Sequence, residues 1–287
     1  MEPKWTEIAR DLQYSVKNYV GLTKMIVQIM QRAHAYGIDP ANEELLIGKK
    51  AKEGSYQGLE SLKGMASRRI EKVLKGFDLW TDWLVNVPGI GPVIAGQLIA
   101  LYYFKSVPVC QKCGADLEEF TCPICKADSK GQGLLKFRTE KRTFPTISSW
   151  WHFLGRHVVD GKMPKRRKQR EDDEENPNDW SNVGRKLGYD IKESFNKFPS
   201  SHKYKAYAEK RKQYRLNTHP DATKGHRHNM AWNEAVKLFQ SHFWQVAHIL
   251  DGEEMTQPWC VQFGGHDPSS IIQPYYFNGD LQEEEAA

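Results

Sequence analysis

The stretch Val87-Pro88-Gly89-Ile90-Gly91-Pro92-Val93-Ile94-Ala95-Gly96-Gln97-Leu98-Ile99 decides the fold of this chain. Apolar residues fill the segment before it, residues 77–85, and recur after it at helical spacing through residue 101. Two helices are therefore predicted to meet at a very short turn that contains two glycines. We expect a mainly α-helical protein, a helical bundle, built around this turn.

The composition of the turn suggests what it can bind. Gly89 and Gly91 can adopt positive φ and bring backbone close to a ligand, while Ile90 can fill the gap between the helices. Pro92 suits the first position of the second helix, where its missing N–H is not needed. The unpaired N–H groups and the positive end of the helix dipole at this point favour an anion. The alternative is a tight corner between two helices that only packs.

The Pro-Gly-Ile-Gly sequence at residues 88–91 resembles the turn of the helix-hairpin-helix motif. That motif holds the backbone of DNA or RNA without reading the bases. The resemblance implies that Gly89, Ile90, Gly91 and Val93 contact a phosphate.

Length and composition indicate a globular, non-membrane chain. Its 287 residues suffice for one large domain or two modest ones, and a hydrophobic content of 39% supports a buried core. The mean hydropathy is −0.67, and no apolar run approaches the roughly 18 residues of a membrane helix. The first residues do not resemble a signal peptide. We therefore expect a cytoplasmic protein, nucleoid-associated or phage-encoded.

Positive charge is concentrated in one segment. The net charge of +5 is only mildly basic, but residues 136–170 carry many cations against two acidic residues, Glu140 and Asp160. Such a segment attracts phosphate. Its cations are Lys136, Arg138, Lys141, Arg142, Arg156, Lys162, Lys165, Arg166, Arg167, Lys168 and Arg170.

Four of the five cysteines form two C-x2-C pairs, Cys110 with Cys113 and Cys122 with Cys125. Four thiolates at this spacing can surround one tetrahedral Zn²⁺, which predicts a structural zinc ribbon inserted at residues 107–137. Redox or iron–sulfur use is the alternative. Cys260 stands alone and is expected to be a free thiol.

The N-terminal region, residues 1–76, is predicted to be helical. Residues 5–35 form one helix with apolar residues near heptad positions, and a second helix spans about residues 56–76. The two helices form either an antiparallel pair within the chain or the seam of a coiled-coil homodimer.

Further helices are expected at about residues 183–195, 203–216 and 230–250, and a short helix within residues 144–155 that Thr146 or Ser148 could cap. The Trp150-Trp151 pair is either core or a platform for stacked bases. In the helix at 203–216, tyrosines interleaved with lysines and arginines either face a nucleic acid or turn inward. His219, His226 and His228 are either metal ligands or contacts to phosphate or to the helix N-terminus. Residues 251–287 are expected to be a loop-like tail.

A basic run at residues 165–170 meets an acidic run at residues 171–175 with no periodicity. We interpret this as a loop that orders on a phosphate backbone, the acidic run competing for the arginines when no ligand is present. A solvated loop without function is the alternative.

The order of these motifs resembles one family. Pro-Gly-Ile-Gly-Pro is followed by Thr-Phe-Pro-Thr-Ile-Ser-Ser-Trp at 143–150, by Leu154-Gly155, by Ser-Asn-Val-Gly-Arg-Lys-Leu at 181–187, and by a helix with Val-Lys-Leu-Phe at 236–239. This set, over about residues 80–250, resembles the C-terminal domain of the Piv/MooV-type DNA invertases and the bridge-RNA-guided insertion-sequence transposases. It looks most like their stand-alone relatives that carry a zinc ribbon.

The chain departs from that family at its catalytic parts. The helical N-terminal region has no pattern of the RuvC-like nuclease domain. Where the family has a nucleophilic serine, the loop reads Asp160-Gly161-Lys162. We therefore predict no catalytic residue and retain Asp160 as the one candidate.

The sequence thus favours a non-catalytic, zinc-stabilised protein that binds DNA or structured RNA. The alternatives are a transposase or site-specific recombinase subunit that acts with a separate nuclease or guide RNA, and an adaptor that binds protein. The expected ranges are 1–76, a transposase-like domain at 77–250, and the tail at 251–287. The predicted nucleic-acid-binding residues are Gly89, Ile90, Gly91, Val93, Arg142, Lys162, Lys165, Arg166, Arg167, Lys168, Arg170, Arg185 and Lys186.

Overall fold

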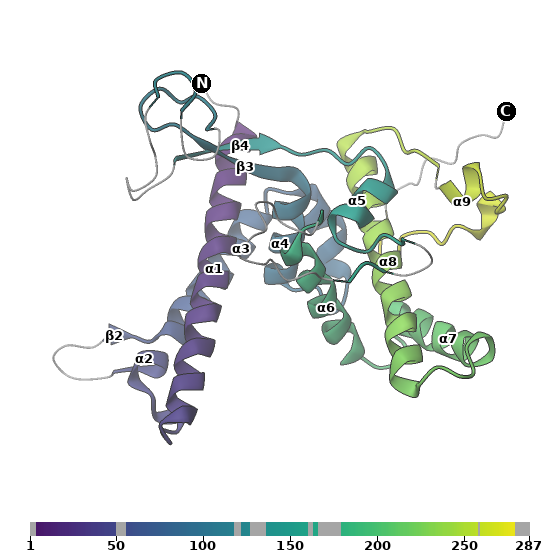
Figure 1. The fold of residues 1–287 in the computed structure, drawn as a ribbon, viewed down its shortest axis with the longest axis horizontal. Helices are drawn as coiled ribbons and strands as arrows, with labels where there is room; N and C mark the ends of the chain where they lie inside the picture. Colours follow the sequence, from purple (N-terminus) through teal and green to yellow (C-terminus); the bar gives the residue numbers. More distant parts are fainter. Residues whose placement is uncertain are drawn as a thin grey trace. The chain divides into compact units, whose positions relative to one another are not determined.

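The computed structural model describes residues 4–49, 56–117, 122–126, 136–159, 163–165, 179–257 and 259–278. These residues are mainly helical, as predicted from the sequence (Figure 1). Their strands form two small antiparallel sheets of two strands each. The chain divides into two compact units, Met1–Val73 with Ile99–Thr143, and Leu74–Leu98 with Phe144–Ala287.

The first unit contains two helices that contact each other in antiparallel order. Helix α1 spans Lys4–Ala35 and α3 spans Leu59–Leu74. Arg69 pairs with Asp11, and the Lys63 ammonium lies 5.5 Å from the centre of the Tyr19 ring. Higher residue numbers on α3 therefore contact lower residue numbers on α1, so the two helices run in opposite directions. This arrangement is the antiparallel pair within one chain that the sequence offered as one interpretation. The alternative, a coiled-coil homodimer, stays a prediction. Leu62, an apolar residue of α3, is exposed.

Short elements connect these two helices. They are the 3-10 turn η1 (Pro40–Asn42), α2 (Glu44–Ile47), β1 (Gly48–Lys49) and β2 (Tyr56–Gln57). Strands β1 and β2 pair in antiparallel register, with Gly48 opposite Gln57.

A hairpin of strands β3 (Phe104–Val109) and β4 (Lys136–Lys141) carries the cysteine-rich ribbon. In its register, Phe104 lies opposite Lys141 and Val109 opposite Lys136. The Gln13 side-chain oxygen on α1 accepts hydrogen bonds from Ser106 at 3.3 Å and Thr139 at 3.2 Å. The ribbon thus belongs to the same compact unit as the N-terminal helices, whereas the sequence placed it within residues 77–250.

The helix expected before the glycine turn is irregular. Leu79–Trp83 is a π turn (η2), and a 3-10 turn, η3 (Leu84–Asn86), follows it. Leu79, Trp80, Trp83 and Leu84 are all buried. In a wider turn, side chains five positions apart lie on the same side, which lets this run of bulky residues enter the core together. Helix α4 then spans Pro92–Tyr103, and its first seven residues belong to the second unit.

The core of the second unit is aromatic. Its helices are α5 (Ile147–Phe153), α6 (Asn182–Asn196), α7 (Lys203–Thr218) and α8 (Lys224–Asp251). Helix α8 starts six residues before the predicted position because the Thr223 side chain caps it. Trp150 is buried and so belongs to the core. The largest fully buried side chains of this unit are Trp83, Trp150, Tyr204, Phe195, Phe239 and Phe243.

The segment after α8 is loop-like, with only α9 (Trp259–Gln262) and the 3-10 turn η4 (Pro268–Ser270). It nevertheless packs into the core. The Trp83 indole donates a hydrogen bond to the Tyr275 carbonyl at 2.8 Å, and the Lys203 amide donates to the Tyr276 hydroxyl at 2.9 Å. This segment therefore satisfies polar groups of the core and of α7.

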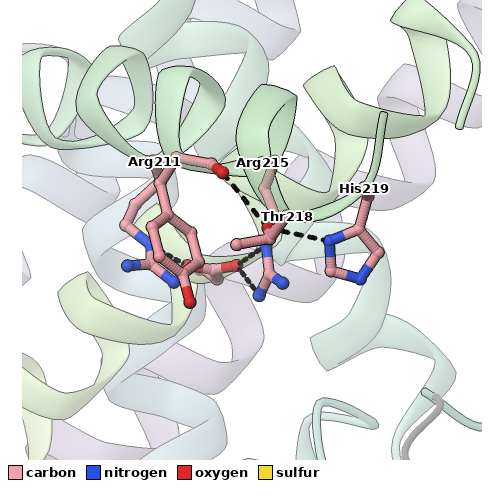
Figure 2. Close-up of polar contacts among 6 residues, drawn as sticks. Arg211, Arg215, Thr218 and His219 are labelled. Atoms are coloured by element: carbon pink, nitrogen blue, oxygen red, sulfur yellow. Dashed lines mark hydrogen bonds and ion pairs between the residues drawn. The ribbon is translucent and has the colours of Figure 1, made fainter. Parts of the chain in front are cut away.

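Helices α7 and α8 lie side by side and are joined by charge (Figure 1). Arg211 and Arg215 on α7 both pair with Glu234 on α8, the Arg215 Nε at 2.8 Å. Figure 2 shows these arginines together with Thr218 and His219 at the end of α7. In the part of the chain that is described, no helix has the length and apolar character needed to cross a membrane.

Acid should destabilise the second unit through His242. This buried side chain lies between the Tyr204 hydroxyl (2.9 Å) and the Ile272 carbonyl (2.9 Å), and burial lowers its pKa from 6.5 to about 4. Between pH 6.5 and about 4, His242 therefore binds a proton in the unfolded chain but stays neutral in the folded chain. Stability should fall by about 3 kcal/mol as the pH drops from 7 to 4, measured by urea unfolding.

The pH dependence should be much smaller in His242→Gln. In His226→Gln, whose parent histidine is exposed, it should match the original protein. An unchanged dependence in His242→Gln would contradict the assignment.

Candidate metal centre and nucleic-acid interface

The four cysteines of the ribbon meet at one point. Their Sγ atoms all lie within 4.8 Å of one another, with 3.6 Å between Cys110 and Cys125 and 3.4 Å between Cys113 and Cys122. Thiolates about 2.3 Å from a central ion in a tetrahedron are about 3.8 Å apart. All four are free thiols. The predicted ligand set therefore has the spacing of a site for one metal ion.

The two halves of this site repeat the same turn. The Gly114 amide donates to the Cys110 carbonyl at 2.9 Å, and the Lys126 amide donates to the Cys122 carbonyl at 3.0 Å. Gly114 and Lys126 both have positive φ, which reverses the chain directly after the second cysteine of each pair. Each C-x2-C loop thus directs its two sulfurs to the same side.

Without a cation the four sulfurs cannot all be ionised. Hydrogen bonds from backbone N–H groups, chiefly that of Cys125, lower the pKa of Cys122 to about 6. The amide of Ala115 also lowers the pKa of Cys113, but the adjacent Cys122 and burial outweigh it and raise that pKa to about 12. Negative charges this close repel each other, so a bound cation is what allows every thiol to ionise.

The glycine turn is anchored on its Gly89 side. Gly89 has φ of +89°, and a Cβ there would lie 2.9 Å from Phe198 and 2.9 Å from the Ser194 hydroxyl. The Ser194 hydroxyl donates to the Gly89 carbonyl at 2.6 Å, and the His202 ring contacts the Pro88 carbonyl at 3.0 Å. The end of α6 and the start of α7 therefore fix the turn from one side, and Ile90 is buried beneath it.

The Gly91 side of the turn is open. Gly91 is exposed, and a Cβ built there would meet nothing within 4 Å. Its φ is not positive, so of the two glycines only Gly89 adopts the left-handed backbone that both can take. Within the described ranges, the amides of Gly91, Val93 and Ile94 have no hydrogen-bond acceptor. Of the predicted contact residues, Gly91 and Val93 thus have amides without an acceptor among the described residues.

The predicted cations Arg185 and Lys186 do not lie at this turn. They belong to the first turn of α6, and Arg185 is about 14 Å along the helix from Ser194 and on the opposite face. The Arg185 guanidinium donates to the Pro164 carbonyl at 2.6 Å and lies 5.4 Å from the Trp180 ring. Lys186 pairs with Asp190 at 2.7 Å. Arg185 is therefore held by the fold, and burial lowers its pKa.

Two other arginines of the basic segment are also held by the protein. The Arg142 guanidinium, in the first unit, donates to the Leu101 carbonyl at 2.7 Å, and burial lowers the pKa of Arg142. Arg156 is buried and donates to Asn233 at 2.7 Å. Gly188 leaves room for it, because a Cβ there would come within 2.3 Å of the guanidinium. The expectation that Arg156 attracts phosphate is wrong, since the fold buries it.

Lys165 is exposed. The remaining predicted contacts, Lys162, Arg166, Arg167, Lys168 and Arg170, lie outside the described residues, as does Asp160.

Two other lysines follow in sequence the residues that anchor the turn. Lys197 follows Ser194 by less than one helical turn, and Lys203 follows His202 directly; both side chains are exposed. Lys205 is bonded to the Phe198 carbonyl at 2.6 Å. Lys203 belongs to the basic helix predicted at residues 203–216, whereas Lys197 is not among the predicted contacts.

Neither protein-family models, nor curated proteins, nor solved structures gave a match to this chain.

The cysteine site predicts a specific loss of metal. Cys110→Ser should lose the bound ion, because removal of one thiolate opens the tetrahedral site. Cys260→Ser should keep one ion per chain, since that cysteine is outside the set of four. Elemental analysis of the purified proteins gives the metal content. Equal contents in the two variants would exclude the four-cysteine site.

The two glycines of the turn should differ in their effect on stability. Gly89→Ala should cost about 1–3 kcal/mol because it combines positive φ with contact to Phe198 and Ser194. Gly91→Ala should stay within about 0.5 kcal/mol, because its Cβ enters open space. Thermal unfolding of both variants provides the comparison. Similar losses of stability in the two variants would show that the turn is not anchored on the Gly89 side alone.

Proposed function

We propose that this protein binds the phosphate backbone of DNA or structured RNA at the glycine turn. The observation that carries the proposal is the open Gly91 side, where the amides at the start of α4 lack acceptors among the described residues. Backbone N–H groups at a helix N-terminus, with the positive end of its dipole, favour a phosphate oxygen.

The anchored Gly89 side supports the same function. Because the Ser194 and His202 contacts fix the turn in advance, a ligand would not have to order it on binding. A preorganised site loses less conformational entropy when it binds. A turn that served packing alone would also seal the Gly91 side, which here stays exposed.

Lys197 and Lys203 supply charge beside this turn. Their exposed ammonium groups can neutralise the phosphates that neighbour the one held by the amides. Such contacts carry no base identity, so binding should be weakly selective for sequence.

Helix α7 offers a further contact. Tyr204 is buried, but Tyr214 is exposed, and the guanidinium groups of Arg211 and Arg215 lie 4.2 and 5.5 Å from the Tyr214 ring. A tyrosine flanked by cations can stack on an unpaired base. This surface would favour single-stranded segments.

The ion of the four-cysteine site is, in this proposal, Zn²⁺. Four soft thiolates in a tetrahedral arrangement suit zinc. Sulfurs 3.4–3.6 Å apart surround one ion, whereas a multi-iron cluster would have to fit between them. With four protein ligands no coordination position is open, so the ion would stabilise the ribbon and not catalyse a reaction.

The resemblance to the C-terminal domain of the Piv/MooV-type invertases and bridge-RNA-guided transposases agrees with this proposal. In that family the resembling domain contacts nucleic acid, and here the same order of motifs follows the open turn along the chain. The role would be to hold a polynucleotide.

A salt titration of nucleic-acid binding tests the proposal. Lys197→Gln combined with Lys203→Gln should weaken binding to duplexes of any sequence and reduce the slope of log K against log salt by roughly two. Gly91→Ala should weaken binding at every salt concentration with an unchanged slope, because it obstructs the amides without removing charge. Filter binding or fluorescence anisotropy measures both.

The matched control is Lys24→Gln combined with Lys72→Gln, which removes two exposed lysines of α1 and α3 in the first unit. This variant should keep the original slope. Absence of binding at low salt, or equal slopes in both double variants, would overturn the proposal.

A further inference from the structure

A second group of potential metal ligands lies in the second unit, apart from the cysteines. His152, His157 and Asp179 each offer one ligand atom, and these atoms lie within 4.8 Å of one another. The His152 Nε2 is 3.0 Å from Asp179 Oδ2, and the rings of His152 and His157 are stacked with 4.2 Å between their centres. Residues from the end of α5, the following loop and the approach to α6 thus converge.

The end of α5 is shaped to bring the two histidines together. Gly155 has φ of +63°, its amide donates to the His152 carbonyl at 2.9 Å, and the Arg156 amide donates to the Trp151 carbonyl at 2.7 Å. This pair of bonds is a Schellman motif, which turns the chain back over the last helical turn. His157 consequently returns to the His152 ring.

Asp179 is brought to the same place from the other direction. The Ser181 amide donates to the Phe153 carbonyl at 2.8 Å, which ties the start of α6 to the end of α5. Trp180 covers Gly155 so closely that a Cβ there would lie 2.6 Å from the indole. These contacts fix the two residues that directly follow Asp179, and Asp179 lies beside His152.

The His157 ring carries an unsatisfied polar atom. Its Nδ1 is buried and makes no hydrogen bond. Buried polar atoms normally have a partner, and a neutral imidazole nitrogen is the commonest metal ligand in proteins. Burial, and then the proximity of His152, lowers the pKa of His157. The titratable side chains near it are His152, Asp179 and Arg185.

We infer that His152, His157 and Asp179 form a second metal site, for a divalent transition-metal ion such as Zn²⁺, Co²⁺ or Ni²⁺. Two imidazoles and one carboxylate are donors of this class of ion, whereas Mg²⁺ and Ca²⁺ prefer oxygen ligands. The inference does not depend on the proposed nucleic-acid binding.

The three ligand atoms need to move only a short distance to bind one ion. Ligand atoms about 2.1 Å from a tetrahedral ion lie about 3.4 Å apart, close to the 3.0 Å between His152 and Asp179. Both of these side chains are about half exposed or more, so they can rotate toward His157. Three protein ligands leave at least one coordination position open, unlike the four-cysteine site.

The ion would also close a loop in the chain. His157 and Asp179 flank residues 158–178, so an ion bound to both joins the two ends of that segment. Binding to the folded state alone raises stability by mass action.

Cobalt titration of the full chain, purified without a histidine tag and with Zn²⁺ in the cysteine site, tests this inference. We expect one Co²⁺ per chain, with visible d–d absorption and no thiolate-to-cobalt charge-transfer absorption. Added Co²⁺ should also raise the thermal unfolding temperature.

His157→Ala and Asp179→Ala should each weaken Co²⁺ binding at least tenfold. Because His157 is half-buried and its loss can affect folding, His152→Ala repeats the test at a more exposed ligand. His226→Ala is the matched control and should bind Co²⁺ like the original protein.

The inference would be overturned if the zinc-loaded chain binds no Co²⁺, or if only thiolate charge-transfer absorption appears. Equal affinity in the ligand variants and in His226→Ala would also overturn it. The contact between His152 and Asp179 would then be a surface ion pair only.

Discussion

The second unit depends on the anchoring of the glycine turn under the end of α6 and the start of α7. Gly89 has no side chain, so Ser194 and Phe198 can approach its backbone, and His202 reaches the Pro88 carbonyl. The carbonyls of this turn are thereby satisfied without closing the Gly91 side. If Gly89 carried a side chain, α6 and α7 would have to move.

Each candidate site in this chain is formed by a residue with left-handed backbone. Gly89 turns the chain into α4, Gly114 and Lys126 reverse it after each cysteine pair, and Gly155 folds it back over α5. Such a reversal brings side chains or amides that are close in sequence to the same side of the backbone. Chemical groups that a regular helix would separate are therefore gathered without a large structural element. This explains how each C-x2-C pair and the pair His152 and His157 arise from short segments, whereas Asp179 joins from a separate one.

The sequence predicted the local features well and the long-range ones poorly. The helical class and the convergence of Cys110, Cys113, Cys122 and Cys125 follow from periodicity and from C-x2-C spacing, which are local properties. Which lysines and arginines are exposed could not be predicted from such local properties. A lysine or arginine attracts phosphate only if it is exposed, and whether Arg156 is exposed depends on the room that Gly188 leaves on another helix. The irregular turn at Leu79–Trp83 also escaped prediction, because its cause is the burial of several bulky side chains together.

The sequence by itself determined which segments become helices, where a tight turn interrupts them, and which four sulfurs can share an ion. Only the tertiary structure decided which side of the turn is sealed, which basic residues stand beside it, and that two histidines and an aspartate from separate segments meet. The reason is that spacing along the chain fixes local geometry, whereas exposure and contacts between distant residues depend on how the helices pack.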